Sequence, residues 1–102
     1  MKVGDVGDVD RLVGEPRKKY YFNRRGMWDA GVIVSCCTDL PLSYPDIPAS
    51  IYASCGGYFG DDKSFNTQNI LTVPELLTAW TANGQYNCYN DGRLGKLKAG
   101  ML

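Results

Sequence analysis

The sequence predicts a mainly β fold with one short α-helix, an α+β architecture built as a small sandwich or barrel behind an extended N-terminal arm. Three observations favour it. Several runs of β-branched and aromatic residues alternate with polar residues, and turns rich in glycine and proline separate these runs. Only the stretch that starts at Thr72 predicts a helix convincingly. The chain has 102 residues, the usual size of one domain, so we expect a single core.

The first 16 residues predict an extended arm, and residues 17–102 predict a single small β-rich domain. The arm contains four acidic residues and three glycines, and Val3, Val6 and Val9 recur at every third position, a period that fits neither a strand nor a helix. Asp5, Asp8 and Asp10 are the candidate ligands for a hard cation such as calcium. Their spacing does not match an EF-hand loop, so we favour a solvated arm and expect no metal or other cofactor.

Residue alternation predicts the strands. Residues 27–37 are apolar on nearly both faces, which is typical of a central strand. The three prolines of residues 38–48 remove backbone donors, so this segment predicts a fixed surface loop. Asn90-Asp91-Gly92 is a strong hairpin signal. In all, we expect strands at residues 17–23, 27–37, 49–59, 85–89 and 93–98, with a turn at 60–63.

The predicted helix begins after Thr72 and covers about ten residues. Thr72 is a suitable N-cap, Pro74 suits the first turn, and Glu75 stands where a capping box places its acid. Asn83-Gly84 would close the helix. Its apolar residues would pack against the sheet.

Charge and residue types exclude several classes of protein. The 11 Lys and Arg residues balance the 11 Asp and Glu residues, and there is no histidine. Proteins that bind bulk nucleic acid or an anionic membrane surface rely on a large positive excess. Without histidine, Ser-His-Asp, Cys-His and His-metal sites are impossible. We therefore do not expect an enzyme.

The sequence also predicts that the protein neither crosses a membrane nor is secreted through a signal peptide. No run approaches the roughly 20 apolar residues of a membrane span. The N-terminus is acidic and glycine-rich, whereas a signal peptide needs a basic start followed by an apolar stretch. We expect a chain made in the cytoplasm, with no membrane partner.

Two further groups of residues could form a catalytic or metal-binding site, but each has a simpler explanation. Gly60-Asp61-Asp62 resembles the catalytic turn of viral RNA-dependent polymerases, where paired acids hold magnesium, but an acidic β-turn accounts for it better. The cysteines do not have the Cys-x-x-Cys spacing of a zinc site. We favour burial as small apolar side chains over a disulfide, and a disulfide over zinc, for Cys36, Cys37, Cys55 and Cys88.

A basic and aromatic block is the candidate partner-binding site. It consists of Arg17, Lys18, Lys19, Tyr20, Tyr21, Arg24 and Arg25. Cations interleaved with aromatic rings are typical of single-strand nucleic-acid platforms. Residues 26–92, however, hold seven acids and one lysine, and residues 93–98 are basic again. Charge blocks that sum to zero suit contact between copies or with another protein, which we favour over nucleic acid.

Tyrosine is abundant as well. Seven tyrosines cannot all fit one small core, so some should be exposed or lie at an interface. A small inhibitor or a nucleic-acid-binding module that uses residues 17–25 remains the alternative to an assembly protein.

The C-terminal part of the chain adds a resemblance. Residues 72–84 and the ending Leu97-Lys98-Ala99-Gly100-Met101-Leu102 resemble the endings of small decoration and head-fibre proteins of tailed bacteriophages. The resemblance implies an auxiliary virion protein of the capsid or tail, assembled in the host cytoplasm. Its partners would be other virion proteins or copies of itself. It implies no catalytic residues.

Overall fold

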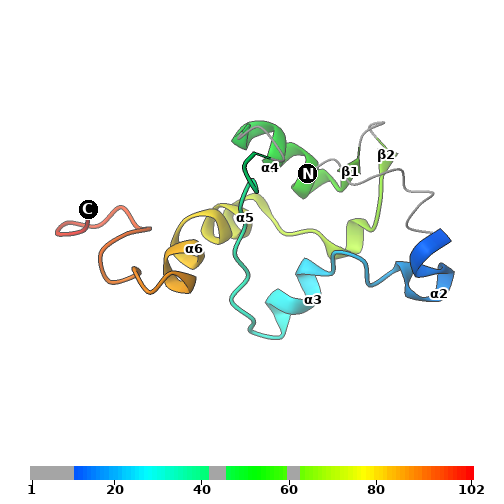
Figure 1. Ribbon diagram of the computed structural model, residues 1–102, viewed down its shortest axis with the longest axis horizontal. Coiled ribbons are helices and arrows are strands. Elements are labelled where there is room, and N and C mark those ends of the chain that lie inside the picture. Colours follow the sequence, from blue (N-terminus) through cyan, green and yellow to red (C-terminus); the bar gives the residue numbers. More distant parts are fainter. Residues whose placement is uncertain (1–10, 42–45, 60–62) are drawn as a thin grey trace.

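The computed structural model describes residues 11–41, 46–59 and 63–102. Helices are the main regular structure of these residues, and residues 11–13 also form a short helical segment (Figure 1). The elements, in chain order, are α2 (Glu15–Lys18), α3 (Arg24–Asp29), α4 (Ile47–Gly56), β1 (Tyr58–Phe59), β2 (Lys63–Ser64), the 3-10 helix η1 (Thr67–Asn69), α5 (Val73–Trp80) and α6 (Ala82–Asn87).

The prediction of a mainly β sandwich or barrel is wrong. Within the described ranges the only strands are β1 and β2, which form a two-residue antiparallel pair with Tyr58 opposite Ser64. Helices or turns take the place of the predicted strands at 17–23, 49–57 and 85–89. Residues 93–96 form a turn and bends, and residues 97–98 are irregular. The end of the predicted extended arm, residues 11–16, is mainly helical too, while residues 1–10 lie outside the described part.

Helix α4 shows the physical reason for this error. The side chain of Asp46 caps it by accepting a hydrogen bond from the backbone N–H of Ala49 at 2.9 Å. Pro48 occupies the first turn, and Gly57 ends the helix in the left-handed conformation, with φ 67°. These end signals prevail over the period-two alternation of residues 49–59, because the alternating residues include many small ones that fit either structure. The proline-rich loop predicted for 38–48 therefore ends earlier, at Asp46.

Helix α5 begins as predicted. Thr72 is its N-cap, a proline stands in its first turn, and the capping box is present, with Glu75 Oε2 accepting from the backbone N–H of Thr72 at 2.8 Å. The predicted end is wrong, because α5 stops at Trp80 and α6 begins at Ala82. Thr81, with φ −115° and ψ −87°, bends the chain between the two helices.

The predicted central strand, residues 27–37, has no strand partner in the described part. Its start belongs to α3, and residues 32–39 form an irregular segment that runs beside α5 and α6. Backbone and side-chain groups of these helices hold it. The N–H of Cys36 donates to the carbonyl of Ala79 at 3.1 Å, and the amide of Asn83 donates to the carbonyl of Val34 at 2.9 Å.

The core is very small. Among the described residues its buried apolar side chains are Val34, Leu71, Leu76 and Ala79. The molecule measures 49 × 30 × 20 Å, and its radius of gyration of 15.1 Å exceeds the roughly 13 Å of a compact chain of this length. Its accessible surface is 7252 Å², against about 5,700 Å² expected for a compact monomer of the same mass. The described part thus buries few apolar side chains for a self-contained domain.

Gly57 lies between α4 and the β1–β2 pair, and replacing it tests how closely the chain packs at this junction. It is buried, has a positive φ, and a Cβ added there would lie 3.0 Å from the backbone oxygen of Phe65. We expect Gly57→Ala to lower the thermal midpoint by more than Gly31→Ala does. Gly31 has a similar φ of +77° but nothing within 4 Å of its Cβ position, so it isolates the backbone strain. Equal shifts for the two variants in a thermal melt would show that the close contact is unimportant.

Candidate interaction surface

The basic and aromatic block does not form one continuous platform. Its residues lie on α2, on the turn that follows it, and on α3. Four of its seven side chains are partly buried: Lys18, Tyr21, Arg24 and Arg25.

Arg25 is held by contacts within the molecule. Its Nη1 and Nη2 donate to the two carboxylate oxygens of Glu75, the first at 2.9 Å, and Nη1 also donates to Asp29 at 3.1 Å. Its Nε donates to the backbone oxygen of Ile70 at 3.3 Å. This network links α3 to the first turn of α5 across 50 positions of sequence. The positive charge of Arg25 is therefore balanced by Glu75 and Asp29 within the molecule and is not available to a partner.

Arg24 carries the one buried side-chain nitrogen or oxygen of the described residues that has no hydrogen-bond partner. Its Nη2 donates to the backbone oxygen of Ser54 at 3.4 Å, and its buried Nε has no hydrogen-bond partner. Burial raises the pKa of the thiols of Cys36 and Cys55, while the nearby charge of Arg24 opposes this rise. Both thiols thus stay protonated at neutral pH.

Two asparagines fix the turn that carries the middle of the block. The amide of Asn66 donates to the backbone oxygen of Lys18 at 2.7 Å, and the amide of Asn69 donates to that of Lys19 at 2.8 Å. Both also donate to the backbone oxygen of Tyr21, whose ring packs edge-on against Phe65 with centroids 6.5 Å apart. The Nζ of Lys18 lies 5.8 Å from the centroid of the Phe65 ring. This half of the block therefore packs against residues 65–69, which include η1.

Three residues of the block remain exposed: Arg17, Lys19 and Tyr20. The ammonium of Lys19 lies over the ring of Tyr20, 5.0 Å from its centroid. Arg17 Nε donates to the backbone oxygen of Val13 at 2.9 Å, which leaves the rest of its guanidinium accessible. The structure thus reduces the candidate site to a small cationic and aromatic patch beside α2. Partner binding at this patch stays a prediction.

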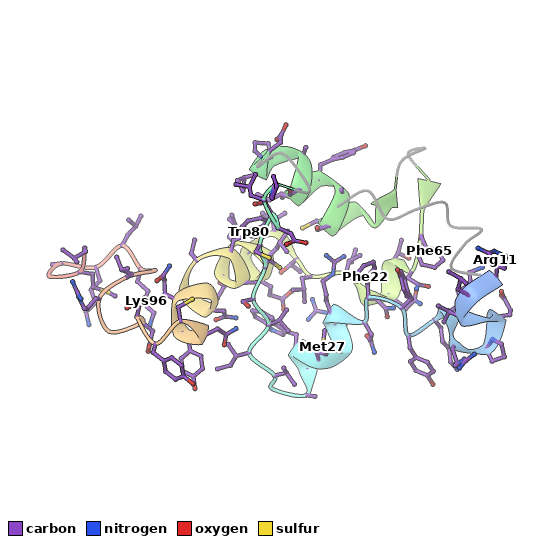
Figure 2. All side chains as sticks on the ribbon, viewed as in Figure 1. Arg11, Phe22, Met27, Phe65, Trp80 and Lys96 are labelled. Atoms are coloured by element: carbon purple, nitrogen blue, oxygen red, sulfur yellow. The ribbon has the colours of Figure 1, made fainter. Side chains whose placement is uncertain are left out.

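The structure places a second basic surface at the other end of the molecule. We call residues 90–102 the C-terminal loop. It contains Arg93, Lys96 and Lys98, all exposed and without a hydrogen bond or ion pair from their side chains within the described ranges. Figure 2 shows Lys96 at one end of the long axis and Arg11 at the other. The basic residues of 93–98 were visible in the sequence, but the predicted hairpin misplaced them.

Backbone hydrogen bonds and packing hold the C-terminal loop in place. The N–H of Leu94 donates to the carbonyl of Asn90, and the N–H of Leu102 donates to the carbonyl of Arg93, each at 2.9 Å. Gly95 lies so close to α6 that a Cβ there would be 3.0 Å from the Cα of Ala82. The loop presents Leu97 fully exposed to solvent.

The prediction that some tyrosines are exposed is confirmed. Tyr20, Tyr52, Tyr86 and Tyr89 are all more than half exposed, and Tyr89 reaches 95%. Exposed tyrosine is typical of protein interfaces, because it buries a large area with few rotatable bonds.

The other candidate sites gain no support from geometry. Asp5, Asp8, Asp10, Asp61 and Asp62 lie outside the described residues. All four cysteines are free thiols; Cys36 and Cys55 are partly buried as predicted, whereas Cys37 and Cys88 are exposed, so the prediction of burial is wrong for them. The described residues contain no cluster of three potential metal ligands. None of the described helices has the length and apolar character required to span a bilayer.

The Arg25–Glu75 contact predicts how stability depends on pH. The guanidinium of Arg25, with help from Thr72, lowers the pKa of Glu75 from 4.5 to about 2. Because the folded-state pKa is the lower one, this stabilisation is complete above pH 4.5 and is lost as the pH falls toward 2. We expect the thermal midpoint of the native protein to fall more steeply over that interval than that of Glu75→Gln. Parallel pH profiles would contradict it.

Comparisons of this chain with family models, with curated proteins and with solved structures found no match.

Proposed function

We propose that this chain is a non-enzymatic structural protein that joins a larger assembly through contacts with other protein chains. The observation that carries the proposal is the imbalance between core and surface. Among the described residues only four apolar side chains are buried, whereas 14 large hydrophobic side chains are exposed. Contacts with other chains would cover part of this apolar surface.

The exposed side chains have the composition expected of such contacts. Large apolar and aromatic residues, including Tyr20, Tyr52, Tyr89 and Leu97, lie at the surface of several elements. Interface cores are enriched in tyrosine and arginine, and a zero net charge allows chains to approach without strong mutual repulsion. The resemblance of the C-terminal residues to phage decoration and head-fibre proteins supports a virion as the setting, with the chain as an accessory of the capsid or tail.

A nucleic-acid-binding module is less well supported. The predicted platform needed its cations free, and Arg25 is instead paired with Glu75 and Asp29. The patch of Arg17, Lys19 and Tyr20 is small for a site that must follow a phosphate backbone.

Native mass spectrometry of the reduced, untagged protein over a range of concentrations tests the proposal. We expect an oligomer that forms as the concentration rises, with no metal bound. A chain that stays monomeric at high micromolar concentration and still unfolds cooperatively would contradict the proposal, because it would show a self-sufficient fold. A bound divalent ion would instead favour one of the acidic sites.

A further inference from the structure

The backbone of residues 32–39 is bonded to the rest of the molecule along one side only. These residues contain no helix, turn or bend, and Figure 1 shows them leading from α3 toward α4. In such an extended chain, successive residues direct their N–H and C=O groups to opposite sides. The carbonyl of Val34 accepts from Asn83, and the N–H of Cys36 donates to Ala79. The backbone groups of Val34 and Cys36 thus point toward α5 and α6.

The alternate residues Ile33, Ser35 and Cys37 therefore direct their backbone groups to the other side, which we call the free edge. Their N–H and C=O groups have no hydrogen-bond partner among the described residues. The free edge is open to solvent, because Ile33 is 41% exposed and Ser35 and Cys37 are exposed as well. An extended backbone with one unpaired edge is a template on which a strand of another chain can pair.

The residues of the free edge favour a second copy of the same segment as its partner. Residues 30–38 contain no charged side chain, so two copies can pair there without placing like charges opposite each other. Short uncharged stretches of high β propensity, such as Val32-Ile33-Val34, pair readily with identical stretches. The same pattern predicted a central strand, and a strand neighbour is what residues 32–37 lack within the described part.

We propose that two copies of this chain pair antiparallel through their free edges, about a two-fold axis beside Ser35. This register places Ser35 opposite the partner's Ser35 and Ile33 opposite the partner's Cys37. All the residues with free backbone groups then face one another, and each opposing pair can exchange two hydrogen bonds. A shift of the pairing by two residues leaves one residue of each free edge without such a counterpart. This inference rests on the proposed function and names one of its contacts.

Apolar side chains beside the free edge would be covered by the same contact. Val32 is 51% exposed and Met27 is 43% exposed. The N–H of Val32 donates to the carbonyl of Met27 at 3.0 Å, which holds the two residues next to each other. A hydrogen bond made in place of one to water contributes only about 0.5–1.5 kcal/mol, so burial of these side chains adds to the stability of the pair.

Ser35→Pro in the full chain tests the contact. Proline removes the N–H at the centre of the pair, so we expect self-association to weaken about tenfold or more in sedimentation. This N–H makes no hydrogen bond within the described residues, so the monomer should still fold, as circular dichroism at low concentration would show. Ser35→Ala is the matched control. Both variants lose the hydroxyl that accepts from Asn87 at 2.8 Å, but alanine keeps the N–H and should associate like the native protein.

Disulfide trapping tests the register without a proline variant. The Cα atoms of a hydrogen-bonded antiparallel pair lie about 5.5 Å apart, within the roughly 4.4–6.8 Å that a disulfide requires. Cys37→Ser/Cys88→Ser removes the two exposed thiols. In that chain, Ser35→Cys should form a covalent dimer when oxidised glutathione is added. Thr67→Cys, at an exposed position of η1, is the matched control and should form far less dimer in the same time.

Three outcomes would overturn the contact while leaving the proposed function standing. The first is an oligomer that Ser35→Pro leaves intact. The second is equal weakening by Ser35→Pro and Ser35→Ala, which would assign the effect to the hydroxyl. The third is a Ser35→Cys chain that crosslinks no faster than Thr67→Cys. A native protein that is monomeric at all concentrations would contradict both the contact and the proposed function, and so is distinguished from a failure of the contact alone.

Discussion

Replacing Leu76 by alanine should leave most of the isolated chain unfolded at room temperature. Leu76 is 1% exposed and is one of the two largest fully buried side chains of the described part, the other being Leu71. A buried Leu→Ala change costs about 2–5 kcal/mol, and whole domains are stable by only about 5–15 kcal/mol. A core this small places the chain at the low end of that range. Far-ultraviolet circular dichroism and a thermal melt would measure the loss.

Leu77→Ala is the matched control. Leu77 follows Leu76 on α5 but is 43% exposed, so its truncation should change stability by about 0.5 kcal/mol or less. Similar melting curves for the two variants would show that α5 does not bury the face described here. Leu71→Ala should behave like Leu76→Ala, because Leu71 is buried to the same extent.

The N-terminal ends of α4 and α5 show how much of the fold could be predicted from the sequence. Thr72-Val-Pro-Glu predicted the beginning of α5 correctly. Asp46-Ile-Pro-Ala has the same order of an N-capping residue and a proline in the first turn, and Gly57 provides the stop signal, yet alternation at 49–59 suggested a strand. In a stretch of alanine, serine and cysteine, alternation says little about which face is buried, so the N-cap, the proline and the terminal glycine determine the helix.

The side-chain contacts could not have been derived in the same way. Arg25 stands in a run of five cations within residues 17–25, and nothing local distinguishes it from Arg17. Its partner, Glu75, lies 50 positions away, and the pairing depends on how α3 and α5 pack. The amide of Asn83, likewise, takes the place of a strand neighbour for residues 32–39 by donating to the carbonyl of Val34. A hydrogen bond from a side chain, made in place of one from a neighbouring strand, produces no periodic pattern in the sequence.

Properties that depend on amino-acid composition were easier to predict than individual contacts. The number of tyrosines exceeded what a small core can hold, and four of the tyrosines whose side chains the structure describes are exposed. The basic residues of 93–98 also suggested a charged surface, although the prediction of a hairpin gave it the wrong geometry. Composition limits how much a core can bury, whereas the position of each contact requires the fold.

Glu75→Gln should lower the thermal midpoint by roughly 4–8 °C or more at neutral pH. Glu75 has two roles, since its carboxylate pairs with both terminal nitrogens of Arg25 and also accepts from the backbone N–H and the hydroxyl of Thr72. Glutamine keeps the size and one acceptor oxygen but loses the charge, so the cap weakens and the link from α3 to α5 loses its charge-assisted bonds. Differential scanning calorimetry at pH 7 measures the shift.

Arg25→Lys separates the two roles of Glu75. Lysine keeps the positive charge but cannot make the paired contact with both carboxylate oxygens, nor the additional contacts to Ile70 and Asp29 in the same geometry. If the Arg25 contact dominates, adding Arg25→Lys to Glu75→Gln should lower the midpoint by much less than Arg25→Lys lowers it alone. Additive shifts would mean that Glu75 acts chiefly as the cap of α5. Arg17→Lys, at an exposed position whose side chain contacts only a backbone oxygen, should leave the midpoint nearly unchanged in the same series.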